Sequence, residues 1–197
     1  MGRPKEYDRD ELLDRSVELF RSQGFHGTTT ADLVEDLGIN RKSMYAEFGS
    51  KQSLFEATLE HYDRNHLTRV LAPVEADDAG VDDIRGAFEG YAAASGGWAN
   101  GRGCLMANTA VERAAIDEAS GRFVDAYLAR IHRAFSHALA NGRTTGAISR
   151  DADLDELAGF LTTTLVGIAA CLRAEASSDQ LHATSRVVAS VLDDSRP

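Results

Sequence analysis

The sequence contains few of the residues that mark disulfide-bonded, secreted or metal-binding proteins. Its 197 residues include two cysteines, Cys104 and Cys171, and neither has a second cysteine or a histidine at metal-ligand spacing. Free thiols are typical of a reducing compartment, so we expect a cytoplasmic protein. We expect no metal site and no cofactor.

Long hydrophobic runs are missing as well. The longest uncharged apolar stretch, Leu157–Leu172, is shorter than the roughly 20 residues that a membrane-spanning helix needs, and it carries three threonines. The N-terminal segment MGRPKEYDRDE lacks the hydrophobic core of a signal peptide. We therefore expect no membrane partner and interpret the apolar stretch as a buried helix.

Catalytic signatures and an excess of positive charge are two further absences. None of the P-loop, GxSxG, HExxH or GxGxxG patterns occurs, so the sequence does not indicate an enzyme. With 31 Asp and Glu against 21 Lys and Arg, the formal charge is −10. Such a chain is not a general polyanion binder, and any contact with nucleic acid must come from a local patch.

Helical periodicity recurs along the whole chain, whereas no run shows sustained alternation of apolar and polar residues. The fold class is therefore all-α, with about nine helices. Pro73 and the acidic stretch EADDAG after it are expected to end the fourth helix, and NGRTTGAIS to form a loop. The expected helices cover about 8–24, 30–37, 41–48, 50–71, 84–95, 103–115, 117–141, 153–176 and 179–193.

Residues 28–51 predict a helix-turn-helix. Gly38 can take the left-handed conformation that ends a helix, and Ile39 is an apolar plug under the turn. A threonine, Asn40 and Ser50 can cap the second, third and fourth helices. The third helix is about two turns long, so it can offer only a few N-terminal side chains to a major groove.

Charge is distributed unevenly over this N-terminal segment, although residues 1–51 hold eight Lys and Arg against ten Asp and Glu. Acidic residues occupy the first helix, whereas basic residues occupy the arm and the starts of the third and fourth helices. The alternative is an ordinary solvated helix surface. The basic residues concerned are Arg3, Lys5, Arg41, Lys42 and Lys51.

The segment LFRSQGFHGTTTADLVEDLGINRKSMYAEFGSKQSLFEATL resembles the DNA-binding domain of the TetR family of transcriptional regulators. The elements that agree in order are Phe20…Gly24-Phe25…Gly27-Thr28-Thr29, Leu37-Gly38-Ile39, Ser43-Met44-Tyr45…Phe48 and Ser50-Lys51…Leu54-Phe55. The resemblance covers about residues 8–60, and beyond it only length and all-α layout are similar. It implies a helix-turn-helix DNA-binding domain at 1–52 and a helical ligand-binding and dimerisation domain at 53–197, with the boundary inside the fourth helix.

The resemblance also implies roles for single residues. Thr29 would offer its hydroxyl to a phosphate, Tyr45 its phenol to the DNA backbone, and Lys51 would bind a phosphate at a helix N-terminus. Arg41 can bind guanine through two hydrogen bonds. For Tyr45, packing against Phe48 is the alternative. The candidate DNA contacts are Arg3, Lys5, Thr28, Thr29, Arg41, Lys42, Ser43, Tyr45, Ala46 and Lys51.

Glu47 departs from the family, many members of which carry an aromatic residue or histidine at the Ala46–Glu47 step. Phosphates repel a carboxylate. Glu47 would either accept a hydrogen bond from a cytosine amine or point into solvent.

For the second domain, the resemblance implies a small-molecule effector cavity and a homodimer formed by the last two long helices. The apolar faces of these helices agree with such an interface, because a helix this apolar is either core or interface. A dimer would recognise a palindromic operator in double-stranded DNA. The candidate interface residues are Leu157, Leu161, Leu165, Ile168, Leu172, Val187, Val188 and Val191.

The segment Gly103–Glu112, GCLMANTAVE, looks like a subset of the family that includes regulators sensing electrophiles or oxidants through a cysteine. Cys104 near a helix N-terminus would have a lowered thiol pKa, but it could equally be a small buried hydrophobe. Asn108 and Glu112 share one face of the expected helix. Each candidate for the effector cavity has ordinary core packing as its alternative: Phe88, Tyr91, Trp98, Cys104, Met106, Asn108, Tyr127 and Phe135.

The resemblance thus implies a transcriptional regulator, and we expect a repressor that leaves its operator when it binds a small-molecule effector or when a cysteine is modified. The competing class is an all-α enzyme or small-molecule carrier, which would show a catalytic constellation in the C-terminal part. The sequence does not name the effector, the operator or the regulated genes.

Overall fold

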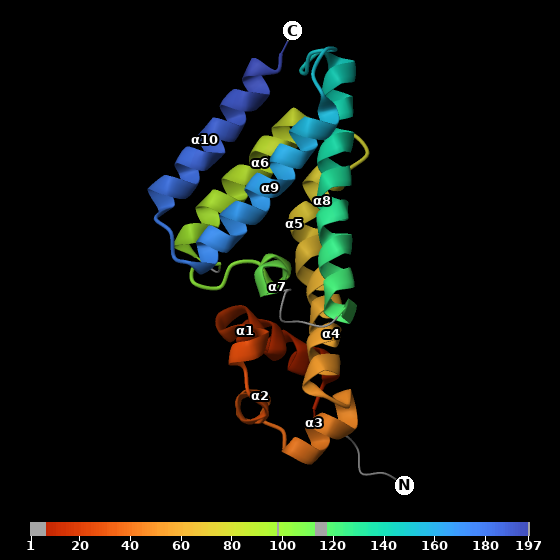
Figure 1. Ribbon diagram of the computed structural model, residues 1–197, viewed down its shortest axis with the longest axis vertical. Coiled ribbons are helices and arrows are strands. Elements are labelled where there is room, and N and C mark those ends of the chain that lie inside the picture. The colour runs from red at the N-terminus through yellow and green to blue at the C-terminus, as the bar shows by residue number, and fades with distance from the viewer. Residues whose placement is uncertain (1–6, 98, 113–117, 197) are drawn as a thin grey trace.

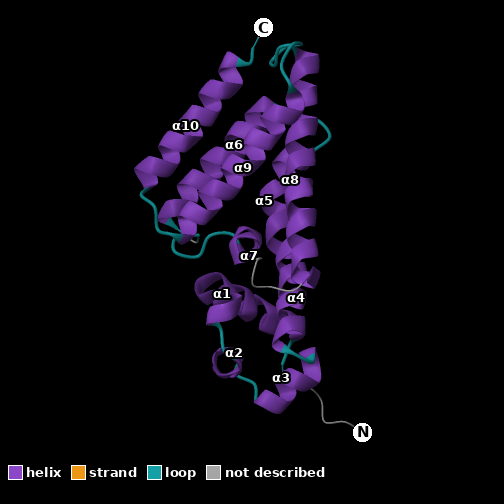
Figure 2. Ribbon diagram, viewed as in Figure 1, coloured by secondary structure: helices purple, strands orange, loops and turns teal. Residues whose placement is uncertain are grey.

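The computed structural model describes residues 7–97, 99–112 and 118–196, and within these ranges it consists of helices and loops without strands (Figures 1 and 2). The prediction of an all-α chain is confirmed. The helices are α1 (Arg9–Gly27), α2 (Thr30–Leu37), α3 (Arg41–Phe48), α4 (Lys51–Tyr62), η1 (Asp63–Leu67), α5 (Thr68–Glu75), α6 (Val81–Ala93), η2 (Ala94–Gly96), α7 (Leu105–Glu112), α8 (Glu118–Thr145), α9 (Leu154–Arg173) and α10 (Ser178–Asp194).

Local capping fixes the starts of the first four helices. The Asp8 carboxylate accepts from the backbone N–H of Asp10, and Thr29 and Asp32 form a reciprocal capping box. Asn40 caps α3 and Ser50 caps α4, each accepting from the N–H three residues on at 2.9 Å. Each cap satisfies an otherwise unpaired donor and contributes about 1 kcal/mol. The predicted starts of these helices are confirmed.

One continuous rod runs from the N-terminal helices in between the long C-terminal helices (Figure 1). It comprises α4, the π-turn η1 and α5, since the residues at both joins keep right-handed helical angles. Pro73 was expected to break this helix, but the helix continues to Glu75 with the proline in its last turn. The ring therefore removes one backbone hydrogen bond only at the helix end, where little helix remains to be disrupted.

Arg130 of α8 holds the rod at its π-turn. Its guanidinium lies 2.7 Å from the Asp63 carboxylate and 2.5 Å from that of Glu75. Because these carboxylates favour the charged guanidinium, with the Glu75 hydrogen bond as the largest cause, the pKa of Arg130 is raised. The α8 helix is thereby fixed to both halves of the rod around η1.

The N-terminal helices pack around one end of the rod, and the longer helices pack around the other (Figure 1). Phe20, Leu33, Met44 and Leu54 are fully buried in the first part, which supplies α1 to α3 with a common core. In the second part α8 packs on α9 and α10 packs on α6. The α8 helix extends to Thr145, so the loop expected at NGRTTGAIS begins later than its glycine pattern suggested.

The short helix α7 lies between these two parts and contacts α1, α4, α8 and α9. It therefore touches both the N-terminal helices and the long helices. The predicted domain boundary after residue 52 stays a prediction, because α4 runs through it without interruption.

The α9 helix stands out for its apolar composition. Among the described residues it is the one helix long and apolar enough to cross a membrane, a property it shares with core helices of soluble proteins. One side of the helix is buried, with Leu161, Leu165 and Ile168 among its buried residues, and its other residues are half-buried or exposed.

Candidate nucleic-acid interface and effector core

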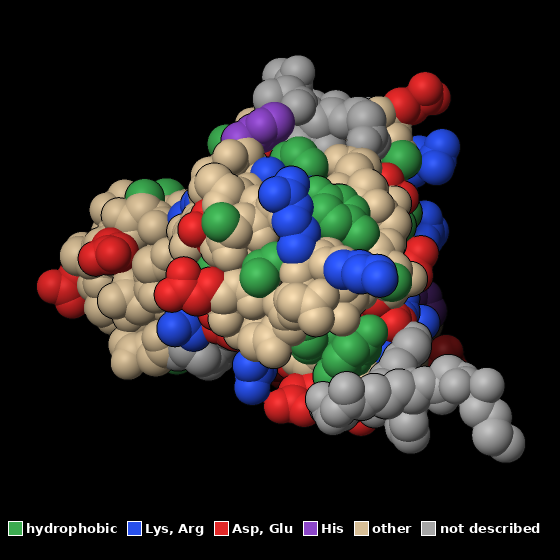
Figure 3. Space-filling view, turned by 90° about the horizontal axis from the view of Figure 1, so that it is seen from below, with side chains coloured by type: hydrophobic (Ala, Val, Ile, Leu, Met, Phe, Trp, Pro, Cys, Tyr) green, Lys and Arg blue, Asp and Glu red, His purple; other side chains and the backbone are tan. Residues whose placement is uncertain are grey.

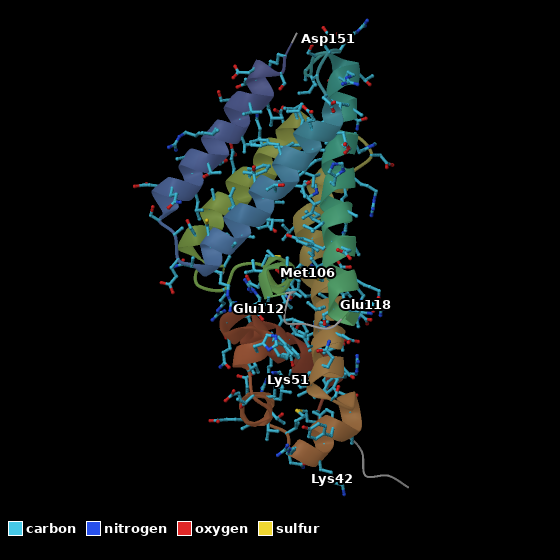
Figure 4. The ribbon with its side chains drawn as sticks, viewed as in Figure 1. Lys42, Lys51, Met106, Glu112, Glu118 and Asp151 are labelled. Carbon is cyan, nitrogen blue, oxygen red and sulfur yellow. The ribbon has the colours of Figure 1, made fainter. Side chains whose placement is uncertain are left out.

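The α3 helix is fixed by one face and free on the other. Met44 and Phe48 are buried against the body, whereas Arg41, Lys42 and Ala46 are exposed. Figure 3 views this end of the molecule and shows Lys and Arg side chains crossing the middle of the surface, with hydrophobic side chains between them. Lys42 lies at the tip of the molecule (Figure 4). The arrangement presents cations and apolar groups together on one protruding helix.

Tyr45 lies on the same face with 38% of its surface exposed. The Arg41 guanidinium carbon lies 5.6 Å from the centroid of its ring. Hydrogen bonding from Thr30, followed by that from Arg41, lowers the pKa of the Tyr45 phenol. The phenol is thus oriented by α2 and α3 together and remains accessible, so it can reach a backbone phosphate of DNA docked on α3.

Lys51 begins α4, and its ammonium nitrogen lies 4.3 Å from the centroid of the Phe25 ring. Partial burial lowers the pKa of Lys51, while the carboxylates of Asp32 and Glu112 act in the opposite direction. Thr29, which caps α2, is exposed near the same surface. Lys51 and Thr29 therefore stand at the N-termini of two helices, where backbone N–H groups and helix dipoles favour an anion.

Two other predicted DNA contacts are less exposed than Arg41 and Lys42. Thr28 is 1% exposed, and its hydroxyl donates to the Gly24 carbonyl at 2.7 Å, so it cannot reach DNA in this structure. Ser43 is half-buried, with its backbone N–H bonded to the Asn40 cap. Arg3 and Lys5 lie outside the described residues.

Glu47 takes neither orientation that the sequence suggested. Only 6% of its side chain is exposed, and its carboxylate lies 3.3 Å from the Tyr7 hydroxyl and 3.5 Å from Arg9 Nε. The expected exposure of Glu47 to solvent or groove is therefore wrong. Its charge is directed at the start of α1, because a partly buried carboxylate is stabilised by a nearby guanidinium. The acid in α3 thus anchors the first helix and does not face a docked phosphate backbone.

The second candidate site surrounds Cys104, which is 2% exposed and directly precedes α7. Its thiol lies 3.8 Å from the Tyr127 hydroxyl. Burial raises the pKa of Tyr62, Tyr91 and Tyr127 well above the usual range, and the nearby Cys104 thiol raises each further. Three phenols thus converge on one thiol inside the helical core.

The other residues predicted for the effector cavity are divided between cavities and core. Met106 and Tyr127 line a cavity of about 70 Å³ between α7, α8 and η1. Tyr91 lies at a groove of about 400 Å³ between α5 and α6. Phe88 and Phe135 are fully buried and stack on each other at 5.9 Å, so they form core. Trp98 lies outside the described residues.

Asn108 was predicted to line the effector cavity, but its side chain is directed at neighbouring backbone. Its amide nitrogen donates to the Arg102 carbonyl at 2.8 Å and to the Arg21 carbonyl at 3.5 Å. A buried carboxamide needs such partners, and here the nearest carbonyls come from the loop before α7 and from α1. Asn108 therefore joins α7 to α1.

Further contacts between α7 and α1 were not predicted from the sequence. The guanidinium of Arg21, which is 2% exposed, donates from Nε at 3.1 Å and from Nη2 at 2.6 Å to the Gly103 carbonyl. The Glu112 carboxylate accepts from the backbone N–H of Phe25 at 3.0 Å. The one sign of these contacts in the sequence was that Asn108 and Glu112 share a helix face.

Several residues predicted for the dimer interface are buried inside the protomer. Leu161, Leu165, Ile168, Leu172 and Val188 are at most 2% exposed, because their faces of α9 and α10 pack onto the other helices. They cannot supply the contact surface of an interface in this conformation. The large apolar side chains left exposed on α9 and α10 are Phe160 at 39% and Val187 at 59%, while Leu157 and Val191 are half-buried.

Family models match both halves of the chain. A model described as "Bacterial regulatory proteins, tetR family" matches residues 12–58, and one described as "Tetracyclin repressor-like, C-terminal domain" matches residues 80–188. The chain is 29% identical over 194 residues to the uncharacterized HTH-type transcriptional regulator YezE of Bacillus subtilis, covering 98% of this chain and 100% of YezE. It is 29% identical to the HTH-type transcriptional repressor ComR of Escherichia coli over 184 residues, 91% of this chain and 86% of ComR.

A solved structure of a cysteine mutant of the TetR-family regulator CifR, in complex with a 26bp operator DNA, has a similar fold. Its TM-score is 0.79 at 26% identity, covering 94% of this chain and 97% of CifR. The reduced form of Escherichia coli NemR matches with a TM-score of 0.78 at 21% identity, covering 93% and 96% of the two chains.

Proposed function

This chain belongs to the TetR family of bacterial regulatory proteins, and from that premise we propose that it is a homodimeric repressor with a palindromic operator. Binding of a small molecule, or modification of Cys104, releases it from the DNA. Its similarity to the repressor ComR supports repression over activation. As a transcriptional regulator it acts on DNA in the cytoplasm and has no catalytic role.

The single observation that carries this proposal is the surface of α3. Arg41 and Lys42 are exposed at the N-terminal end of the helix, while the carboxylate of Glu47 is turned away to Arg9. In the general docking geometry of helix-turn-helix proteins, this end enters the major groove. The helix therefore offers donors to base edges and phosphates without an opposing acid. Lys51 and Thr29 would bind phosphates on either side.

The dimer contact is assigned to the exposed faces of α9 and α10. Phe160 and Val187 are large apolar side chains on these faces, and Gly159 and Gly167 of α9 have no neighbouring atoms within 4 Å of a built Cβ, which permits close helix approach. Covering them with a second protomer buries apolar surface and stabilises the dimer. Two α3 helices placed about 34 Å apart would then read the two halves of a palindrome.

The effector response is assigned to the core around Cys104 and Tyr127. Any group added to a thiol that is 2% exposed must displace its neighbours, because protein cores are close-packed. The first element displaced would be α7, which begins at the next residue and holds α1. The conformation with α7 displaced and the conformation shown here would differ in their affinity for DNA, so the modification would shift the protein off its operator.

Gel-shift or anisotropy titrations with duplexes from the DNA flanking the gene would test the DNA-binding proposal. We expect one palindromic duplex to bind at least a thousandfold more tightly than a scrambled duplex, with a steep decrease in affinity as salt increases. Equal affinity for both duplexes, or no dependence on salt, would contradict the proposal.

Alkylation would test the cysteine response separately. In the Cys171→Ser variant only Cys104 remains to react, so iodoacetamide labelling reports on that thiol alone. We expect labelled Cys171→Ser protein to lose operator affinity, while Cys104→Ser/Cys171→Ser protein treated with the same reagent keeps it. Unchanged affinity at complete labelling of Cys104 would show that this thiol is no sensor.

A further inference from the structure

We propose that Glu112 is a positioning residue for DNA binding, because its carboxylate fixes the Gly24–Phe25 corner of α1 and thereby the aromatic ring that supports Lys51. This inference rests on the proposed function, since it assumes that Lys51 binds a phosphate of the operator. It assigns to α7 a direct mechanical link to one DNA contact. Figure 4 shows Glu112 and Lys51 at the junction of the two parts of the molecule.

The first link in this path is the corner itself. Gly24 has φ 75° and ψ 171°, so it interrupts the helical angles of α1 and turns the chain at this point. The Glu112 carboxylate accepts from the backbone N–H of the next residue, Phe25, at 3.0 Å. A Cβ built at Gly24 would lie 2.2 Å from Glu112 Oε1, so glycine is required both by its backbone angles and by the carboxylate.

The second link runs from Phe25 to Lys51. The Phe25 ring contacts Phe20 and Phe55 on one side, with centroids 6.3 Å and 4.9 Å away, and lies 4.3 Å below the Lys51 ammonium. A cation over an aromatic face is attracted by the ring quadrupole. The ring therefore holds the long Lys51 side chain in place at the N-terminus of α4. This reduces the entropic cost of ordering that side chain when it binds a phosphate.

The third link ties Glu112 to the effector core. The same helix carries Asn108, which donates to the Arg21 carbonyl, and follows Gly103, whose carbonyl accepts from Arg21. Arg173 of α9 also donates to the Arg21 carbonyl and lies 3.9 Å from the Glu112 carboxylate. A displacement of α7 at Cys104 would thus move the carboxylate that holds Phe25.

Operator binding by the full-length dimer with Glu112 variants tests the inference. We expect Glu112→Ala to lower operator affinity about tenfold, within the usual range of coupling between sites. The slope of log affinity against log salt concentration should become shallower by about 1, because one phosphate contact contributes about that much. Glu112→Gln keeps an acceptor for the Phe25 N–H and should stay within roughly twofold of wild type. Thermal unfolding establishes that each variant is folded at the assay temperature.

Glu118→Ala is the matched control. Glu118 begins α8, is exposed, and lies at the same junction in Figure 4, so its removal changes the net charge equally without touching Phe25. We expect unchanged operator affinity. If Glu118→Ala weakened binding as much as Glu112→Ala did, the loss would not depend on the contact with Phe25 and the inference would be overturned.

A double-mutant cycle with Lys51→Ala separates the inference from the proposed function. If Glu112 acts through Lys51, Glu112→Ala should have little further effect in a Lys51→Ala background. Full additivity of the two substitutions would overturn the positioning role, as would unchanged or tighter binding by Glu112→Ala. By contrast, a Lys51→Ala variant with wild-type affinity and salt slope would reject the phosphate contact of Lys51 itself, whatever Glu112 does.

Discussion

The DNA-facing end and the core around Cys104 use the same kinds of side chain in opposite ways. Tyr45 is exposed and hydrogen-bonded by Thr30, and its pKa is lowered. Tyr91 and Tyr127 are buried beside Cys104, and their pKa values are raised by burial. The difference shows that one end leaves its polar groups open to solvent, while the other keeps them neutral inside a packed core.

The largest effect should come from alkaline pH, which separates the two sets of tyrosines. A folded-state pKa raised above the unfolded value near 10 means that the stability due to the protonated phenols is complete below about pH 10. It is lost as pH rises through the folded-state pKa, because the unfolded chain releases these protons first. We expect absorbance at 295 nm to show Tyr45 ionising early and Tyr62, Tyr91 and Tyr127 ionising together with loss of the far-UV circular dichroism signal.

Tyr45→Phe is the control for this titration, since it should remove the early step and leave the late one. Gradual ionisation of the three buried tyrosines while the helices remained intact would contradict the assignment of a closed core.

A glycine substitution before α7 should have the next largest effect. Gly103 has φ 61°, and a Cβ there would lie 2.7 Å from the Ala169 carbonyl of α9. We expect Gly103→Ala to lower the free energy of unfolding by about 3 kcal/mol, from the left-handed backbone and the overlap with backbone together. Gly146→Ala is matched, because Gly146 has φ 79° but open space around it. It should cost about 1 kcal/mol from the backbone alone. Equal losses in urea unfolding would show that the approach of α7 to α9 is not tight.

On the DNA-facing end, Arg41→Ala should leave stability unchanged but relax specificity. Arg41 is exposed, so its removal creates no cavity. Losing a two-point contact with guanine should cost about 2 kcal/mol of discrimination at one position of each half-site. Binding to a set of operators with single base changes measures this. A uniform loss for every operator would instead assign Arg41 to a phosphate.

Lys51→Ala should have the smallest effect, about 1.5 kcal/mol or roughly tenfold at moderate salt, which is also the upper limit for Glu112→Ala if Glu112 acts through Lys51. It should weaken all duplexes alike and lower the salt slope by about 1, because a phosphate carries no sequence information. A change in base preference with an unchanged salt slope would contradict this role. Comparing Lys51→Ala with Arg41→Ala therefore separates a contact with the DNA backbone from a contact that reads a base.

The sequence predicted the DNA-facing end in detail because most of its determinants are local. The caps at Thr29, Asn40 and Ser50 and the left-handed Gly38 were predicted and are confirmed. The same reasoning failed for Thr28 and Glu47, since their partners Gly24 and Arg9 lie in α1 and their partner Tyr7 lies just before its cap. A residue type shows which contacts a side chain can make, but not which neighbour it contacts in the folded protein.

The apolar stripes of α9 and α10 show a second limit of sequence reasoning. Periodicity identified Leu161, Leu165 and Ile168 as one face, yet it could not decide whether that face meets the rest of the protomer or a partner. The structure places this face inside and leaves Phe160 and Val187 outside. The physical reason is that core and interface bury the same kinds of side chain.

The sequence by itself thus determined an all-α chain, its capped helix-turn-helix and its family, since these depend on residues close together along the chain. Only the tertiary structure placed Glu112 beside Phe25, Arg21 beside Gly103 and three tyrosines around Cys104. Those contacts join elements tens of residues apart, and their energies depend on burial and distance that no local pattern encodes.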